Sequence, residues 1–112
     1  MEWTLIAYFF GGVCLVNGVP HFVSGVSGRA FQTPFAKPPG KGYSSSYMNV
    51  IWGLFNWVVA YFLLFKIGTF DIHNYCHFGA FLIGVLVFGL VMAKAFGDIH
   101  GGTNPPPRKD NE

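Results

Sequence analysis

Four polar side chains that could bind a ligand lie inside long apolar stretches of the chain. Asn17 and His21 fall in the first stretch, and Asn49 and Asn56 fall in the second. Spacings of four and seven residues place each pair on one face of a helix. Polar groups inside a membrane are costly, and an ionisable one is by default a functional candidate. We therefore treat these four residues as a candidate ligand site.

A structural role for the same residues stays open. At about 1.5 Å per helical residue, Asn17 and Asn56 lie at similar depth. They could bond each other or the carbonyl freed by Pro20, with His21 as an interfacial anchor. In the alternative, the set binds a ligand, a lipid headgroup or a proton. The residue types do not decide between these two interpretations.

A second histidine pair, His73 and His77, is a weak metal or haem candidate. The two residues are four apart, so in a helix they would share a face, as two-histidine metal sites require. Only Asp71 offers a nearby carboxylate. Two ligands do not complete a site, so we predict no cofactor here and expect a polar, pH-sensitive rim.

The segment between the first two apolar stretches, GRAFQTPFAKPPGKGYSSS, combines aromatic and basic residues. Phe31 and Phe35 alternate with Arg29, Lys37 and Lys41. This pattern suits contact with an anionic membrane surface or with a partner protein. The X-Pro and Pro-Gly steps favour a shaped loop. An ordinary connector with interfacial anchoring is the simpler alternative.

The acidic residues do not form a catalytic set. They all lie near chain ends or turns: Glu2, Asp71, Asp98, Asp110 and Glu112. No serine–histidine–carboxylate set and no complete zinc motif occurs. An enzyme is therefore the less favoured class. A net charge of only +2 also argues against nucleic acid as a partner.

Composition indicates the elements that must position these residues. Hydrophobic residues make up 52% of the 112 residues and charged residues only 11%. A chain this small needs a polar surface to be soluble in water, and this composition cannot supply one. We therefore expect lipid to surround the protein. We predict an all-α membrane protein with one three-helix transmembrane domain, residues 1–97. Its helices span about 3–27, 47–66 and 72–96, with a Pro/Gly-rich basic loop between the first two and a disordered polar tail, 98–112.

Small residues recur at helical spacing on each predicted helix. Helix one carries Ala7, Gly11, Cys14, Gly18, His21, Gly25 and Gly28; helix two carries Asn49, Gly53, Asn56 and Ala60. Helix three has two such stripes, His73, His77, Ala80 and Gly84, and Gly89, Ala93 and Gly97. Membrane helices associate through such faces. We expect helix three to contact both other helices, or one helix and a second copy of the chain.

The basic residues predict the orientation in the membrane. Three crossings put the loop and the tail on one side, where six basic residues gather: Arg29, Lys37, Lys41, Lys94, Arg108 and Lys109. Only Lys66 falls on the other side. Basic residues favour the cytoplasm. The N-terminus is thus predicted outside and the C-terminus cytoplasmic, in the inner (plasma) membrane.

The stretch NGVPHFVSGVSGRAFQTPFAKPPGKGYSS, followed by NVIWGLFN, resembles a group of small, uncharacterised bacterial integral membrane proteins. The resemblance covers residues 17–56, roughly a third of the chain. It implies a bacterial membrane protein and no particular activity. His21, Arg29, Pro34 and the run Pro38 to Gly40 are the positions that define it.

Together these patterns favour a non-enzymatic membrane protein. It would act as an accessory or oligomeric subunit that packs through its small-residue faces, as a homo-oligomer or in a larger membrane complex. The first alternative is a small transport or ligand-binding bundle that uses Asn17, His21 and Asn56. The second is a haem or metal protein that uses His73 and His77.

Overall fold

Three long helices make up most of the computed structural model, which describes residues 3–107. They are α1 (Thr4–Val26), α2 (Ser46–Phe62), which continues as one π-helical turn, η1 (Leu63–Ile67), and α3 (Tyr75–His100). All three runs are long and apolar enough to cross a membrane. The predicted helical class and the number of membrane-length helices agree with the structure.

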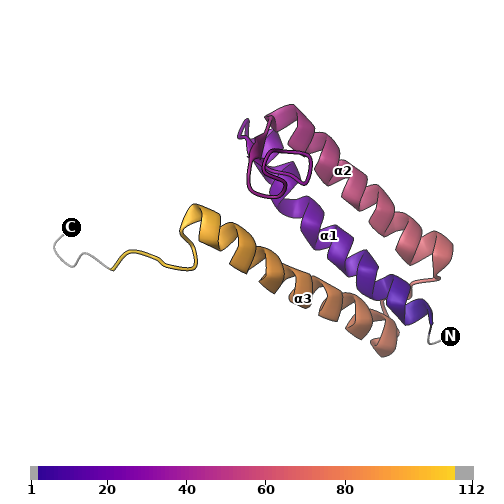
Figure 1. Cartoon of the computed structure of the whole chain (residues 1–112). Helices are drawn as coiled ribbons and strands as arrows, with labels where there is room; N and C mark the ends of the chain where they lie inside the picture. Colours follow the sequence, from indigo (N-terminus) through magenta and orange to yellow (C-terminus); the bar gives the residue numbers. More distant parts are fainter. Residues whose placement is uncertain (1–2, 108–112) are drawn as a thin grey trace.

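Helix α1 is the centre of the arrangement. It lies between α2 and α3 and packs along both of them (Figure 1). Contact between α2 and α3 is marginal at most. Of the two contacts expected for the third helix, the structure therefore provides only the one with the first helix. The axes of α1 and α3 diverge toward the C-terminal end of α3 (Figure 1).

The α1–α2 contact follows the predicted small-residue faces. Gly18 and Gly53 are buried where the two helices cross. A Cβ on Gly53 would lie 2.7 Å from the Phe22 nitrogen and 2.9 Å from the Gly18 oxygen. Both neighbours are backbone atoms, which cannot rotate aside. Glycine at these positions is what lets the two backbones approach.

The α1–α3 contact uses a different pair of glycines. A Cβ on Gly84 would collide with the carbonyl oxygen of Phe9, and one on Gly12 with that of Phe81. Gly84 belongs to a predicted stripe, whereas Gly12 does not. The other predicted stripe on α3 forms no tight seam within residues 3–107: a Cβ on Gly89 would have its nearest neighbour at 3.9 Å, and Ala93 is exposed.

Helix α3 begins and ends later than predicted. The Asn74 side chain caps it by accepting hydrogen bonds from the backbone nitrogens of Cys76 and His77, so the helix starts at Tyr75 instead of residue 72. It ends at Gly101, whose φ of 89° favours glycine. Residues 98–100, assigned to the tail, are therefore helical. Residues 108–112 of that predicted tail lie outside the described part.

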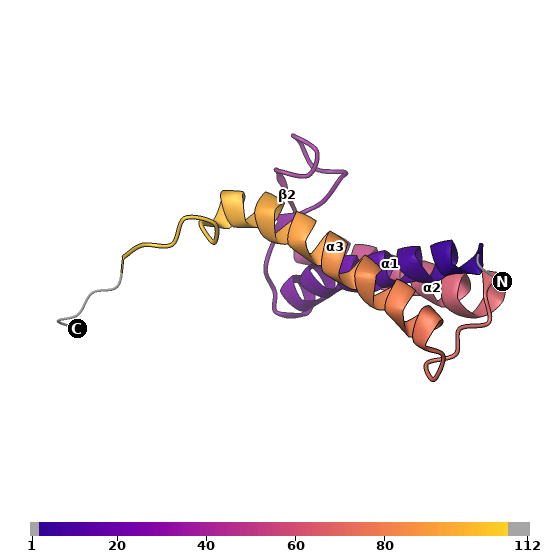
Figure 2. The same ribbon diagram turned by 90° about the horizontal axis from the view of Figure 1, so that it is seen from below.

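The connection between α1 and α2 is folded onto the helices. Its strands β1 (Phe31–Gln32) and β2 (Tyr43–Ser44) pair antiparallel. Gln32 and Thr33 are fully buried, and the Thr33 and Ser44 hydroxyls lie 2.6 Å apart. Ser45 then caps α2 by accepting from the Met48 nitrogen. Figure 2 shows the loop beside the C-terminal half of α3.

Candidate ligand-binding site

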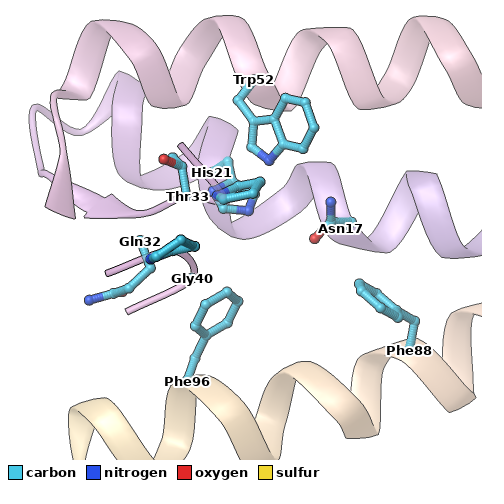
Figure 3. Close-up of a pocket in the computed structure, with 10 residues that line it drawn as sticks. Asn17, His21, Gln32, Thr33, Gly40, Trp52, Phe88 and Phe96 are labelled. Atoms are coloured by element: carbon cyan, nitrogen blue, oxygen red, sulfur yellow. The ribbon is translucent and has the colours of Figure 1, made fainter. Parts of the chain in front are cut away.

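A pocket opens where α1 and α3 diverge and the loop lies beside them. Its volume is about 380 Å³. All three helices and the loop contribute to its wall (Figure 3), which consists of Asn17, His21, Gln32, Thr33, Pro34, Pro39, Gly40, Trp52, Phe88 and Phe96. Asn17 and His21 thus line the same pocket. Asn49 and Asn56 do not line it, but they form hydrogen bonds with His21 and Asn17 from α2.

Asn49 fixes the orientation of the His21 ring. Its side-chain nitrogen donates to the backbone oxygens of Phe31, Ser44 and Ser45 at 3.0–3.2 Å. Its side-chain oxygen must then face His21 and accept from His21 Nδ1–H at 2.9 Å. The proton of the neutral imidazole is therefore held on Nδ1. Nε2 carries the lone pair, so it is a hydrogen-bond acceptor.

Asn56 orients Asn17 in the same way. The Asn56 side-chain nitrogen donates to the backbone oxygen of Trp52 at 2.9 Å. Its oxygen accepts from the Asn17 side-chain nitrogen, also at 2.9 Å. In Figure 3 the nitrogen of Asn17 points toward α2 and its oxygen points away from that helix. The predicted Asn17–Asn56 hydrogen bond is confirmed, and it leaves the Asn17 oxygen for the pocket.

These two acceptor atoms are unpaired. Within residues 3–107, His21 Nε2 and Asn17 Oδ1 have no hydrogen-bond partner, although His21 is only 2% exposed. No side-chain polar atom that is sealed from solvent lacks a partner in this part of the chain. Both atoms therefore retain surface that a molecule in the pocket can reach.

Aromatic rings surround the imidazole. The ring centroids of Phe31, Trp52 and Phe96 lie 5.5, 6.4 and 6.1 Å from that of His21, each close to perpendicular. Trp52 and Phe96 also line the pocket, on opposite sides of His21 (Figure 3). The two acceptor atoms thus lie in a largely apolar wall, to which the described part of the chain contributes no charged residue.

Gln32 and His100 join the loop to the end of α3. The Gln32 side-chain nitrogen donates to the Lys41 oxygen, so its Oε1 accepts from His100 Nε2–H at 2.9 Å. Phe31 stacks on the His100 ring with a centroid distance of 5.3 Å and an angle of 11°. We call these three residues the clasp. Of the three, Gln32 also lines the pocket.

The residues predicted to contact lipid or a partner separate into two groups. Arg29, Phe35, Lys37 and Lys41 are exposed on the loop. Phe31 instead points inward, where it packs against His21, Phe96 and His100. The basic side chains thus surround the loop end of the molecule without lining the pocket.

The histidine pair does not share a helix face. His73 precedes α3, because Asn74 is the cap, and the predicted common face for His73 and His77 is therefore wrong. His77 Nδ1 accepts from the Asp71 nitrogen, and its ring lies 4.5 Å from that of Tyr8. In residues 3–107 no group of three or more metal-ligating side chains occurs.

Several residues of the site carried no signal in the sequence. Gln32, Thr33 and Trp52 reach the pocket only because the loop folds back and α1 pairs with α2. Phe88 and Phe96 are two among 13 phenylalanines, so no pattern singles them out. His100 was assigned to the polar tail.

Comparison of the chain with models of protein families, with curated proteins and with solved structures finds no significant match. The resemblance to small bacterial membrane proteins therefore stays a prediction.

Proposed function

We propose that this chain is a membrane protein that binds a small lipophilic molecule in the pocket between its three helices. One observation carries the proposal: two unpaired acceptor atoms, His21 Nε2 and Asn17 Oδ1, are held at the wall of a pocket of about 380 Å³. Ligand pockets are typically about 300–1,000 Å³, apolar, with few convergent polar groups. This pocket has those properties.

The construction of the site supports binding over a purely structural role. The bond between Asn17 and Asn56, together with the Gly18–Gly53 contact, joins α1 to α2. That structural role does not require His21 to keep an accessible nitrogen that has no hydrogen-bond partner within residues 3–107. A polar atom that lacks a protein partner and faces a pocket can bind a ligand or water.

The membrane setting belongs to the same proposal. The pocket lies at the end of the molecule that carries the loop and the C-terminus of α3, where Arg29, Lys37, Lys41 and Lys94 are exposed. By the positive-inside rule this end faces the cytoplasm. A lipophilic ligand would thus reach the site from the inner half of the plasma membrane.

The test is to identify what the purified protein retains. The full chain is isolated in mild detergent, and small molecules that accompany it are determined by mass spectrometry. Phe88→Trp enlarges a side chain on the pocket wall, whereas Leu86→Trp, on the same helix, enlarges one that is exposed. We expect a molecule retained by the wild type and by Leu86→Trp but reduced severalfold in Phe88→Trp. Equal retention by all three proteins would contradict a ligand in this pocket.

A second candidate function is that of an accessory or oligomeric subunit. It is favoured by the exposure of α3, which is buried only along the face that contacts α1. In the membrane, lipid or another chain can cover the remaining faces. Crosslinking in intact membranes distinguishes these cases: a discrete dimer or a defined heterologous product supports the subunit role, and a monomer alone opposes it.

A further inference from the structure

The two acceptors of the pocket define the chemistry of its ligand, and this inference rests on the proposed function. We propose that the ligand is an uncharged aromatic molecule with two hydrogen-bond donors, such as a dihydroxy aromatic compound. It donates one hydrogen to His21 Nε2 and the other to Asn17 Oδ1.

The first step is that His21 cannot exchange its donor and acceptor nitrogens in the neutral ring. For Nε2 to carry the proton, Nδ1 would face Asn49 as an acceptor and the Asn49 amide would have to turn over. That rotation would point its oxygen at three backbone oxygens at 3.0–3.2 Å and lose three hydrogen bonds. A ligand in the pocket therefore faces a hydrogen-bond acceptor, His21 Nε2.

The second step is that the orientation of Asn17 is also fixed, by its hydrogen bond to Asn56. If it turned its nitrogen to the pocket, its oxygen would face the Asn56 oxygen, now 2.9 Å from the Asn17 nitrogen. Asn56 cannot compensate, because its own nitrogen is bound to the Trp52 oxygen. Asn17 and His21 are one helical turn apart on α1, so both acceptors face the pocket from the same wall.

The third step concerns charge and shape. Among residues 3–107, the wall has no acidic side chain to balance a cation and no basic side chain to balance an anion. Burying an unpaired charge is costly, so an uncharged ligand is favoured. Trp52, Phe88 and Phe96 offer flat apolar surface. A cavity of about 150 Å³ accommodates benzene, so about 380 Å³ suffices for two fused rings.

The test uses three probes with the same naphthalene ring system and the full chain in detergent. They are 2,3-dihydroxynaphthalene, 2-naphthol and 2,3-dimethoxynaphthalene, which offer two, one and no donors. A net hydrogen bond contributes about 1 kcal/mol, or about fivefold in affinity. We expect affinity to fall about fivefold at each step of the series. Equal affinity for any two of the probes would overturn the proposal.

A second readout needs no variant. With nitrogen-15 in the histidines, the Nε2 resonance of His21 reports directly on a donor that approaches it. The dihydroxy probe should shift this resonance and the dimethoxy probe should not. An Nε2 resonance that is unmoved by the dihydroxy probe at saturation would overturn the inference, even if the probe binds.

The matched variant is Asn17→Leu, which keeps the size of the side chain and removes its acceptor. It should lower the affinity for the dihydroxy probe about fivefold and leave that for the dimethoxy probe unchanged. Asn104→Leu, on an exposed residue after α3, is the control. Binding of all three probes with equal strength would refute the donor requirement while a retained ligand still supported the proposed function. Failure of every probe to bind would overturn the proposed ligand class, whereas a different molecule retained by the purified protein would still support the proposed function.

Discussion

At the scale of single residues, Asn49 connects more of the site than any of the other predicted polar residues. One amide joins α1 through His21, both strands of the loop through Phe31 and Ser44, and the start of α2 through Ser45. Asn56 makes two hydrogen bonds. Both residues were candidates for ligand contact, but the structure gives them the task of orienting the side chains that reach the pocket.

Asn49→Ala should therefore destabilise the protein more than Asn56→Ala. The first change removes four hydrogen bonds and the second removes two, with about 0.5–1.5 kcal/mol for each bond. We expect losses of about 2–6 and about 1–3 kcal/mol in the free energy of unfolding. Titration with a denaturing detergent, followed by circular dichroism, measures both. A larger loss for Asn56→Ala would contradict the role given to Asn49.

At the scale of the elements, α1 is positioned by glycines on two of its faces. Gly18 meets Gly53 of α2, while Gly12 lies against the backbone of α3 next to Gly84. Residues at positions 12 and 18 lie on different sides of a helix of 3.6 residues per turn. One central helix can therefore contact two neighbours closely, and the pocket forms beyond the point where these contacts end.

Gly84→Ala should separate α1 from α3. Its new Cβ would collide with the Phe9 oxygen, whereas a Cβ on Gly79 of the same helix meets nothing within 4 Å. We expect Gly84→Ala to lower the free energy of unfolding by about 1–3 kcal/mol. Gly79→Ala should be neutral or stabilise by up to about 1 kcal/mol, because alanine favours helix. The same denaturing-detergent titration applies, and equal effects at both sites would contradict the tight α1–α3 contact.

The clasp offers a separate test on the loop. His100→Ala removes the hydrogen bond to Gln32 and the stacking on Phe31. Together these contribute roughly 1–2 kcal/mol. Amide hydrogens of residues 31–44 should exchange roughly five- to thirtyfold faster, as hydrogen-exchange mass spectrometry can show.

His73→Ala is the matched control for the clasp, because His73 is an exposed histidine outside α3. It should leave exchange in the loop unchanged. Unaltered exchange in His100→Ala would show that the loop holds its position without the clasp.

At the scale of the whole molecule, the two ends differ in charge. The end with the loop carries Arg29, Lys37, Lys41 and Lys94, all exposed, whereas Lys66 lies at the other end near the turn after η1. The contact between Gln32 and His100 places the loop and the C-terminus of α3 at the same end, as three crossings require. The basic residues of the loop and of α3 thus lie at the same end of the molecule, as predicted, and the orientation in the membrane stays a prediction.

A reporter fused after Glu112 tests that orientation. Green fluorescent protein should fluoresce there, because it folds in the cytoplasm, and alkaline phosphatase should be inactive. Fusions after residue 70, in the turn between η1 and α3, should behave in the opposite way. Phosphatase activity after Glu112 would reverse the predicted topology.

The sequence by itself determined the helical class of the protein and part of its packing. Apolar runs of membrane length predict three helices, and residues 3–107 contain three helices long and apolar enough to cross a membrane. Small residues at helical spacing predicted the α1–α2 contact. The sequence left open whether Asn17 and Asn56 bond each other or the carbonyl freed by Pro20, and in the structure they bond each other. These features depend on local periodicity, which the chain displays directly.

Only the tertiary structure decided the site. The direction in which Asn49 turns its amide depends on three carbonyl oxygens brought to it by the loop. Gln32 and His100 meet although they are 68 residues apart, and the aromatic residues of the wall come from two helices, α2 and α3. Hydrogen-bond direction and cavity shape are set by distant groups, so no periodicity in the chain encodes them.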